Sequence, residues 1–293
     1  MAEHADAFDQ RYDVTIITGT RADENVHRGL LSPAAILLQS MSLRVVSWNV
    51  NSLRARLPLV LRYLEQRQPD VLCLQETRIA ASQFPHAAFE PLGYHCQAES
   101  ERSYAGVATL SRLAIRDVVR GIEGSPEHVS RRLLCRVGNV WVDNLYVPTR
   151  KAIGKVDCLD RLRQDYRERF ALASDRLALC GDFNICFDSR DLASLRMISE
   201  AESFGERVED LAFRRLVAIG LQDCFRKHHT EAGSFSWFPM APWAIKRNYG
   251  MRLDYVFATA PLYARCVAAE HDREPRSWQR PSDHLPVCVE FEA

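Results

Sequence analysis

The chain has 293 residues, 47% of them hydrophobic, and its 38 basic and 38 acidic side chains leave no formal net charge. That length can bury a sizeable core without disulfides or metal staples, in one large α/β domain or two small ones. No apolar run approaches the roughly 20 residues that cross a bilayer, so the sequence argues against a membrane protein.

Residues 1–42 form the first segment and show no sustained hydrophobic period. They carry a net charge of −3, which leaves +3 on the remainder, and their acidic start, MAEHADAFD, is unlike a secretory signal. VTIIT is typical of a short strand and SPAAILLQS of a short helix, but neither has an obvious neighbour to pack on. We therefore expect a poorly ordered N-terminal extension.

From Leu43 onward, strand-like and helix-like stretches follow one another clearly. Strands are expected at residues 43–48, 70–76, 106–111, 133–138, 140–147, 177–180, 253–258 and 286–291. Helices are expected at residues 53–68, 155–172 and 203–218, with Pro58 tolerated because it lies near the first turn. Hairpin-like neighbours favour a pair of mixed sheets between helices over a doubly wound parallel sheet. With no repeat or linker, residues 43–293 are expected to form one domain.

The nine cysteines form no CxxC pair and no zinc-type spacing. Their odd number and their place in apolar stretches such as VLCLQ and LALCG indicate reduced thiols that act as small hydrophobic side chains. This usage predicts an intracellular protein, cytoplasmic if the host is bacterial.

Several predicted strands end in a carboxylate or an amide. The four residues in this position are Asn49, Glu76, Asp182 and Asn184. A strand buried on both faces is apolar throughout, so polar groups at its end are expected to face a solvent-filled cleft. Asn49 and Glu76 offer oxygen ligands, which suit Mg²⁺ or Mn²⁺ better than zinc.

The stretch PSDHLPV places Asp283 and His284 directly before the last strand. Histidine is the side chain whose ordinary pKa lies near neutrality. Carboxylates, amides, an imidazole and a hard cation, without a nucleophilic Ser or Cys, indicate attack by water on a phosphate ester. These residues could also have a purely structural role. SDH is typical of a capped turn, and Asp254 could pair with the nearby Arg252.

Nine motifs, in order, resemble the exonuclease III type of AP endonuclease, in the endonuclease/exonuclease/phosphatase superfamily. They are SWNVNSLRAR, DVLCLQETRI, YAGVATLSR, NLYVP, LCGDFNI, GLQDCFR, SFSWF, MRLDYVF and PSDHLPV. The resemblance covers residues 43–293 and implies a catalytic domain built as a four-layer α/β sandwich, with a metal cleft at one end of two mixed sheets. LQETR, FSWF and RLDY with SDH are fairly specific to the DNA-repair branch.

The resemblance also implies roles for residues that match the motifs. Glu76 would be the main ligand for Mg²⁺, or Mn²⁺, with Asn49 beside it and Asp283 near the metal. Asp182 would align or deprotonate the attacking water. Asn184 would hold that water or the phosphate. His284, oriented by Asp254, would bind the scissile phosphate, and Tyr146 would reach a phosphate oxygen.

The implied substrate is double-stranded DNA with abasic sites or damaged 3′ ends, cleaved by a monomer. Trp237, Met251 and Leu253 match the pocket for the extruded sugar, although Met251 stands where some relatives carry a larger aromatic side chain. Basic side chains proposed to contact phosphates are Arg78, Arg131, Arg132, Arg150, Lys246 and Arg247. Two other functions stay open: hydrolysis of another phosphate ester, and RNA binding without catalysis.

Overall fold

A computed structural model describes residues 42–100, 105–149, 152–197 and 205–292. Residues 40–293 form one compact unit. The strand expected in VTIIT, the helix expected in SPAAILLQS and the proposed DNA contact Arg150 lie outside the described residues. The assignment of residues 1–42 as an N-terminal extension therefore stays a prediction.

Two six-stranded sheets make up the centre of the fold. Their strands are β1 (Ser42–Asn49), β2 (Val71–Gln75), β3 (His95–Glu99), β4 (Val107–Ser111), β5 (Ile115–Arg120), β6 (Arg132–Val137), β7 (Val140–Tyr146), β8 (Leu177–Asp182), β9 (Leu221–Asp223), β10 (Asp254–Thr259), β11 (Cys266–His271) and β12 (Val287–Glu292). The strand order is β11-β12-β1-β2-β4-β3 in one sheet and β5-β6-β7-β8-β10-β9 in the other.

Each sheet contains one parallel pair at its centre. β1 and β2 are parallel, as are β7 and β8, and the other paired strands are antiparallel. A helix joins each parallel pair, α2 (Leu53–Arg67) in the first sheet and α4 (Ala152–Arg169) in the second. The other α-helices in the described residues are α3 (His86–Phe89), α5 (Val208–Val217), α6 (Cys224–His228) and α7 (Ala260–Tyr263).

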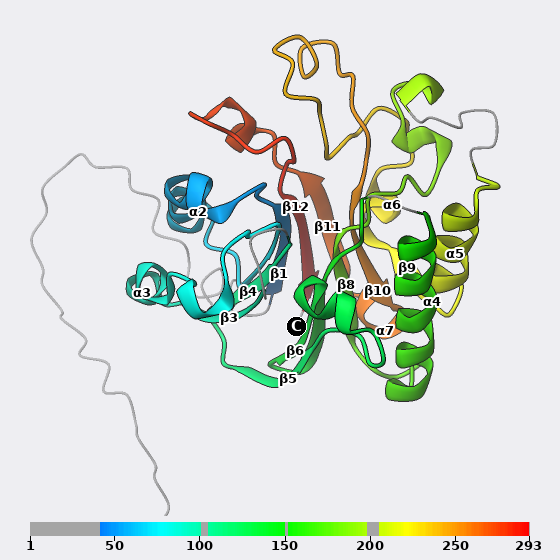
Figure 1. Cartoon of the computed structure of the whole chain (residues 1–293), viewed down its shortest axis with the longest axis horizontal. Coiled ribbons are helices and arrows are strands. Elements are labelled where there is room, and N and C mark those ends of the chain that lie inside the picture. The colour runs from blue at the N-terminus through cyan, green and yellow to red at the C-terminus, as the bar shows by residue number, and fades with distance from the viewer. Residues whose placement is uncertain (1–41, 101–104, 150–151, 198–204, 293) are drawn as a thin grey trace, which may run out of the picture. The chain divides into compact units, whose positions relative to one another are not determined.

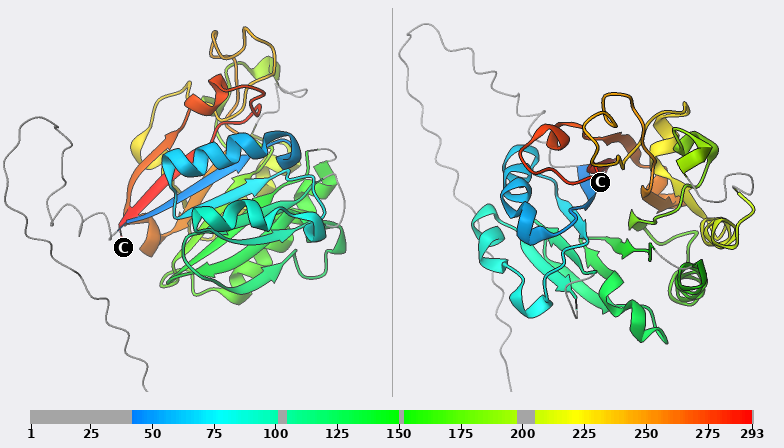
Figure 2. Two further views of the ribbon diagram at one scale, coloured as in Figure 1. Left: turned by 90° about the vertical axis from the view of Figure 1, so that its left-hand side faces the viewer. Right: turned by 45° about the horizontal axis from the view of Figure 1, so that its top comes forward.

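The layers follow from three apolar cores. One core lies between the two sheets, and it includes Val45 and Val289 from the first sheet and Val142 and Val256 from the second. A second core packs α2 and α3 on the outer face of the first sheet, and a third packs α4 and α5 on the outer face of the other. Figures 1 and 2 show helices on both outer faces. This arrangement confirms the predicted four-layer sandwich of two mixed sheets flanked by helices.

Helix α2 contains the one proline that the sequence pattern had to accommodate. Leu53, Val60 and Leu64 are buried against the first sheet, as a helical period predicts. Pro58 lies inside the helix and beyond its first turn, contrary to expectation. The Arg54 carbonyl then lacks its helical donor, but Arg54 and Pro58 are both exposed, so water can replace that donor.

The nine cysteines are all free, and seven of them are buried, in agreement with the prediction of reduced thiols. Cys73, Cys135 and Cys180 pack in the core between the sheets. Among the described residues, no helix has the length and apolar character needed to cross a membrane.

Gly181 allows the two strands of the second parallel pair to approach at the end of the sheet. Its φ of +150° is rarely adopted by other residues, and a Cβ there would lie 1.8 Å from the Leu145 carbonyl oxygen. The register pairs Leu145 with Gly181 and Tyr146 with Asp182. The glycine in GDFN is therefore required by the backbone next to two predicted site residues.

Gly181→Ala is expected to lower the free energy of unfolding by more than about 2 kcal/mol, because the added methyl group cannot fit beside the Leu145 carbonyl. Chemical denaturation followed by circular dichroism measures this change. Gly154→Ala on α4 is the matched control, since a Cβ there meets nothing within 4 Å. Gly154→Ala should leave the free energy of unfolding unchanged or raise it by up to about 1 kcal/mol. Equal free energies of unfolding for the two variants would contradict the requirement for glycine at position 181.

Candidate active site

Strand ends bring the predicted polar side chains to one edge of both sheets. Asn49 ends β1 and Glu76 directly follows β2, while Tyr146 ends β7 and Asp182 ends β8. Asp254 begins β10, which runs antiparallel to β8 and pairs Asp254 with Asp182. The carboxyl ends of both parallel pairs and the amino end of β10 therefore meet at the same place.

Glu76 is the acceptor at the centre of the first group. Its Oε1 accepts hydrogen bonds from Asn49 Nδ2 at 3.0 Å and from the Tyr146 hydroxyl at 2.9 Å, and its Oε2 accepts one from Arg78. Burial raises the pKa of Tyr146, so this hydroxyl stays protonated and donates. Glu76 and Arg78 both have a φ of +51°, an uncommon conformation that is found often at functional sites.

Asp182 is fully buried and joins the two sheets. Its Oδ2 accepts from Asn49 Nδ2 at 2.8 Å, and its Oδ1 accepts from the Asn184 backbone N–H at 2.9 Å. The Asn184 side chain donates to the same carboxylate at 3.2 Å and to the Val147 carbonyl at 3.0 Å. Burial, with the neighbouring Asp254 charge, raises the pKa of Asp182 to about 7.

His284 and Asp254 form a buried pair beside Asp182. His284 Nδ1 lies 2.8 Å from Asp254 Oδ2, and Nε2 lies 3.8 Å from Asp182 Oδ2. Burial alone would lower the pKa of His284, but the charges of Asp254 and Asp182 outweigh it and raise the value to about 10. The imidazole is therefore a cation at neutral pH, with Nε2 directed toward Asp182.

Ser236 and Asn51 complete the network, although neither is among the residues predicted from the sequence. The Ser236 hydroxyl donates to Asp254 Oδ2 at 2.6 Å. Asn51 donates through its side chain to Asp283 at 2.9 Å and through its backbone N–H to Asn49 Oδ1 at 2.9 Å. The signal for Asn51 was its spacing of two residues from Asn49. Ser236, inside SFSWF, had no such signal.

Asp283 contacts the network through Asn51 rather than through Glu76. Its second oxygen accepts from Trp237 Nε1 at 3.0 Å. Burial would raise the pKa of Asp283, but the His284 charge and the two hydrogen bonds hold it below its ordinary value. Asp283 is therefore a carboxylate at neutral pH, and two hydrogen bonds through Asn51 connect it to Asn49.

The three predicted pocket residues lie together next to this network. The backbones of Trp237 and Met251 pair, with N–H···O distances of 2.8 and 2.9 Å, and Trp237 also pairs with His284. Leu253, which is buried, packs with both side chains and with Cys186 and Leu192. Arg252, the alternative partner for Asp254, instead pairs with two other carboxylates, those of Asp191 and Asp223.

The proposed phosphate-contacting arginines fall into different environments. Arg78 pairs with Glu76 and keeps 41% of its side chain exposed, and Arg131 lies over the Tyr146 ring at 5.0 Å. Arg132 is fully buried between Asp143 and Asp165, so its assignment as a DNA contact is wrong. Lys246 and Arg247 are exposed.

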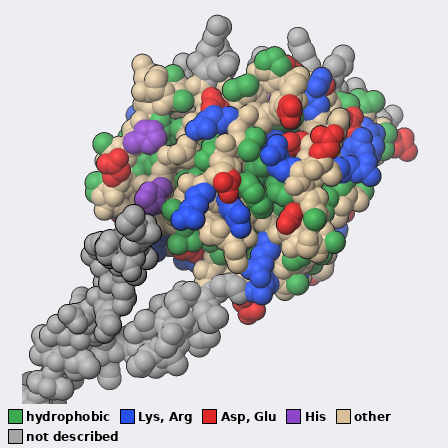
Figure 3. Space-filling model, turned by 90° about the horizontal axis from the view of Figure 1, so that it is seen from below, with side chains coloured by type: hydrophobic (Ala, Val, Ile, Leu, Met, Phe, Trp, Pro, Cys, Tyr) green, Lys and Arg blue, Asp and Glu red, His purple; other side chains and the backbone are tan. Residues whose placement is uncertain are grey.

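The face of the molecule seen from below carries charges of both signs. Basic side chains there are interspersed with acidic and apolar ones (Figure 3).

The donor set fits a divalent cation. Asp182 and Asp254 have carboxylate oxygens within 4.8 Å of each other beside the protonated His284, and among the described residues Asp254 Oδ1 is buried without a hydrogen-bond partner. Glu76 adds a carboxylate, and carboxylate oxygens suit a hard cation. Asn49 presents Nδ2 to both carboxylates, so ligation through its Oδ1 would require the amide to rotate.

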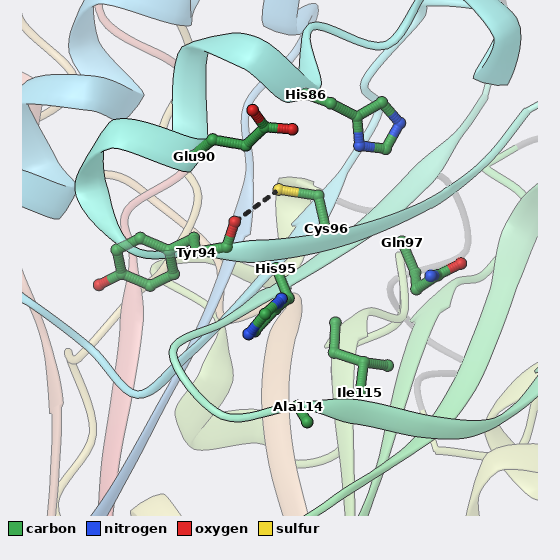
Figure 4. Close-up of a pocket in the computed structure, with 8 residues that line it drawn as sticks. All are labelled: His86, Glu90, Tyr94, His95, Cys96, Gln97, Ala114 and Ile115. Carbon is green, nitrogen blue, oxygen red and sulfur yellow. Dashed lines mark hydrogen bonds between the residues drawn. The ribbon is translucent and has the colours of Figure 1, made fainter.

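A separate pocket of about 300 Å³ lies beside β3. Figure 4 shows its lining residues, which are His86, Glu90, Tyr94, His95, Cys96, Gln97, Ala114 and Ile115. None of these residues belongs to the hydrogen-bonded network around Glu76 and Asp182. The candidate catalytic side chains therefore lie at the strand ends and not in this pocket.

Comparison with known proteins gives consistent matches. A model of the endonuclease/exonuclease/phosphatase family matches residues 46–284. Exodeoxyribonuclease III of Haemophilus influenzae is 29% identical over 266 residues, which cover 85% of this chain and 100% of the relative. An AP endonuclease from Archaeoglobus fulgidus has a TM-score of 0.81 and 30% identity, covering 86% of this chain and 100% of that one. A 3′ phosphatase from Neisseria, bound to product DNA hairpin, has a TM-score of 0.77, 30% identity and the same coverage.

In metal-free protein, the His284 imidazole is expected to stay protonated at pH 8, because its pKa is raised to about 10. Asp254→Asn removes the carboxylate that raises this pKa most, so the proton should leave at lower pH. NMR titration of the imidazole nitrogens measures the pKa of His284 in the native protein and in Asp254→Asn. Ser236→Ala keeps the carboxylate and is the control. A native His284 that titrates near pH 6.5 would contradict the assignment.

The interaction between His284 and Asp254 also predicts how the free energy of unfolding depends on pH. The folded pKa of His284 lies above the unfolded value of about 6.5, so its stabilising contribution is complete below pH 6.5. That contribution is lost as pH rises toward the folded value of about 10. The difference in unfolding free energy between the native protein and Asp254→Asn should therefore shrink over this window in urea titrations, and a constant difference would refute the linkage.

Proposed function

The chain belongs to the endonuclease/exonuclease/phosphatase family, and we propose that it hydrolyses DNA phosphodiester bonds 5′ to abasic sites and at damaged 3′ ends. One observation carries this function. A cationic His284, held by Asp254, faces Asp182 across 3.8 Å in a network that reaches Glu76. The similarity to an exodeoxyribonuclease III and to an AP endonuclease supports the role of a nuclease in base excision repair.

His284 stabilises the charge that develops on the phosphate. In-line attack by water spreads negative charge over the phosphate oxygens. The imidazolium, oriented through Nδ1 by Asp254, keeps Nε2–H available to donate to one of these oxygens. Because the pair is buried and preorganised, this interaction is stronger than it would be in water.

Asp182 accepts a proton from the attacking water. Its pKa of about 7 lies close to the working pH, which is the value that favours a general base. Asn49 and the Asn184 backbone fix the carboxylate by donating to both of its oxygens. The Asn184 side chain donates to the Val147 carbonyl and to the Asp182 carboxylate, so it would lie next to a water that Asp182 aligns.

Metal dependence is a property of this family, and the acidic groups of the site could hold a metal ion. We assign Mg²⁺, or alternatively Mn²⁺, to Glu76 with Asn49 and Asp283. When bound, the cation would neutralise charge on the phosphate oxygens. Tyr146, whose hydroxyl donates to Glu76, would position this carboxylate and lie within reach of the phosphate.

Trp237, Met251 and Leu253 form the pocket for the extruded sugar. An apolar pocket admits a sugar without its base and excludes an intact nucleotide by size. Trp237 also links this pocket to Asp283 through its Nε1–H. Arg78, which pairs with Glu76, and Arg131, which lies over the Tyr146 ring, would contact the DNA backbone without reading its sequence.

His284→Ala and Asp182→Asn are each expected to reduce cleavage of an abasic duplex by at least about 10²-fold while the protein still binds it, because each removes a group that acts in the transition state. A gel assay with Mg²⁺ measures the rate, and EDTA should abolish it. Asp117→Asn is the matched control, since Asp117 is an exposed carboxylate on edge strand β5.

Wild-type cleavage rates in His284→Ala or Asp182→Asn would exclude these roles. RNA binding with no cleavage of any duplex would favour the non-catalytic alternative. Faster hydrolysis of a small phosphate ester than of the abasic duplex would favour the other enzymatic alternative.

Met251→Ala should widen the sugar pocket and raise the rate of removal of intact 3′ nucleotides relative to abasic-site incision. Met251→Phe should lower the same ratio, because the larger ring adds bulk to the apolar cluster in which Met251 and Trp237 pack. Both ratios come from parallel assays on an abasic duplex and a recessed 3′ end. If both variants keep the native ratio, the pocket does not set substrate choice.

A further inference from the structure

Glu127, His128 and Asp157 form a second group of potential metal ligands outside the active site. The ligand atoms of the three side chains lie within 4.8 Å of one another. Glu127 and His128 belong to a 3-10 helix, η3 (Pro126–Arg131), and Asp157 lies on α4. None of these residues takes part in the active-site network described above.

His128 is buried with its ring nitrogens unused. Only 3% of the residue is exposed, and within the described part of the chain neither Nδ1 nor Nε2 has a hydrogen-bond partner. Nε2 lies 3.7 Å from Glu127 Oε1 and 3.6 Å from Asp157 Oδ2, which is too long for hydrogen bonds. A buried polar side chain in this state is unfavourable unless a ligand satisfies it.

The two nitrogen–oxygen separations are a few tenths of an ångström longer than those between the ligands of a bound metal ion. Bonds of about 2.0–2.1 Å in a tetrahedral site place neighbouring ligand atoms about 3.3–3.4 Å apart. Small side-chain shifts would therefore let one ion contact Nε2 and both carboxylates. The Glu127 and Asp157 side chains are 57% and 36% exposed, so an ion can enter from solvent and keep water ligands.

Neighbouring side chains orient Asp157 toward His128. Arg161 Nε donates to Asp157 Oδ1 at 2.8 Å, and the Ser125 hydroxyl lies 3.5 Å from Oδ2. This leaves Oδ2 on the side of the imidazole. Outer hydrogen bonds of this kind are what orients carboxylate ligands in metal sites.

We propose that Glu127, His128 and Asp157 bind a first-row divalent metal ion such as Mn²⁺ or Zn²⁺, in addition to the ion of the active site. One imidazole and two carboxylates suit such an ion better than Mg²⁺, which prefers oxygen ligands alone. The bound ion ties η3 to α4. η3 ends at Arg131, whose guanidinium lies 5.0 Å from the centre of the Tyr146 ring, so the ion would restrain a segment next to the active site.

Binding of Mn²⁺ to the tag-free full chain, followed by electron paramagnetic resonance of the free ion, tests this site. The native protein should bind one more ion per chain than His128→Asn. Glu127→Gln should bind that ion at least about tenfold more weakly. Glu123→Gln, which changes an exposed carboxylate in the same segment, should match the native protein.

Glu76→Gln should retain the ion, because Glu76 belongs to the other site. The proposal would be overturned if the native protein, Glu127→Gln and His128→Asn bound Mn²⁺ equally. It would also be overturned if no bound ion were weakened by Glu127→Gln. Since the Glu127 side chain is mostly exposed, its variant should fold even if His128→Asn does not, and circular dichroism checks both.

Discussion

The Asn49 side-chain amide is the link on which the geometry of the site depends. Its two N–H groups donate to Glu76 of the first sheet and to Asp182 of the second. Since all three groups are buried, a shift of one sheet past the other would leave two carboxylates and an amide unpaired. Deeper between the sheets, Gln75 donates to Asn144 at 2.8 Å and holds the same alignment.

Burying charge at this edge is costly, and the structure compensates for it locally. Asp182 and Asp254 lie close together, and the His284 cation between them offsets their repulsion. A buried charged pair of this kind contributes little net stability compared with apolar packing. It supplies a cation and a carboxylate near its pKa in one place, which is the arrangement that phosphodiester hydrolysis needs. Function therefore explains this cluster better than stability does.

The sequence predicted the inner strands and missed the outer ones. The eight predicted strands correspond to β1, β2, β4, β6, β7, β8, β10 and β12, while the missed β3, β5, β9 and β11 are the four sheet edges. Most inner strands, such as β2 and β4, are buried on both faces and appear as continuous apolar runs, while the inner strand β12 shows a clear alternation. Edge strands are partly exposed, as in the pattern of β5, IRDVVR, and their mixed composition shows no period.

The sequence by itself determined which side chains end the inner strands, because an apolar run that stops at a polar residue marks a strand end wherever the strand lies. Asn49, Glu76 and Asp182 were found in this way, and their convergence followed once the strands were placed in two stacked sheets. Only the tertiary structure decided the partners. Arg132 became a core residue because Asp143 and Asp165 surround it, and Ser236 and Asn51 joined the site through contacts between residues distant in sequence. Such contacts depend on how distant segments pack against one another, so a local pattern of residues cannot predict them.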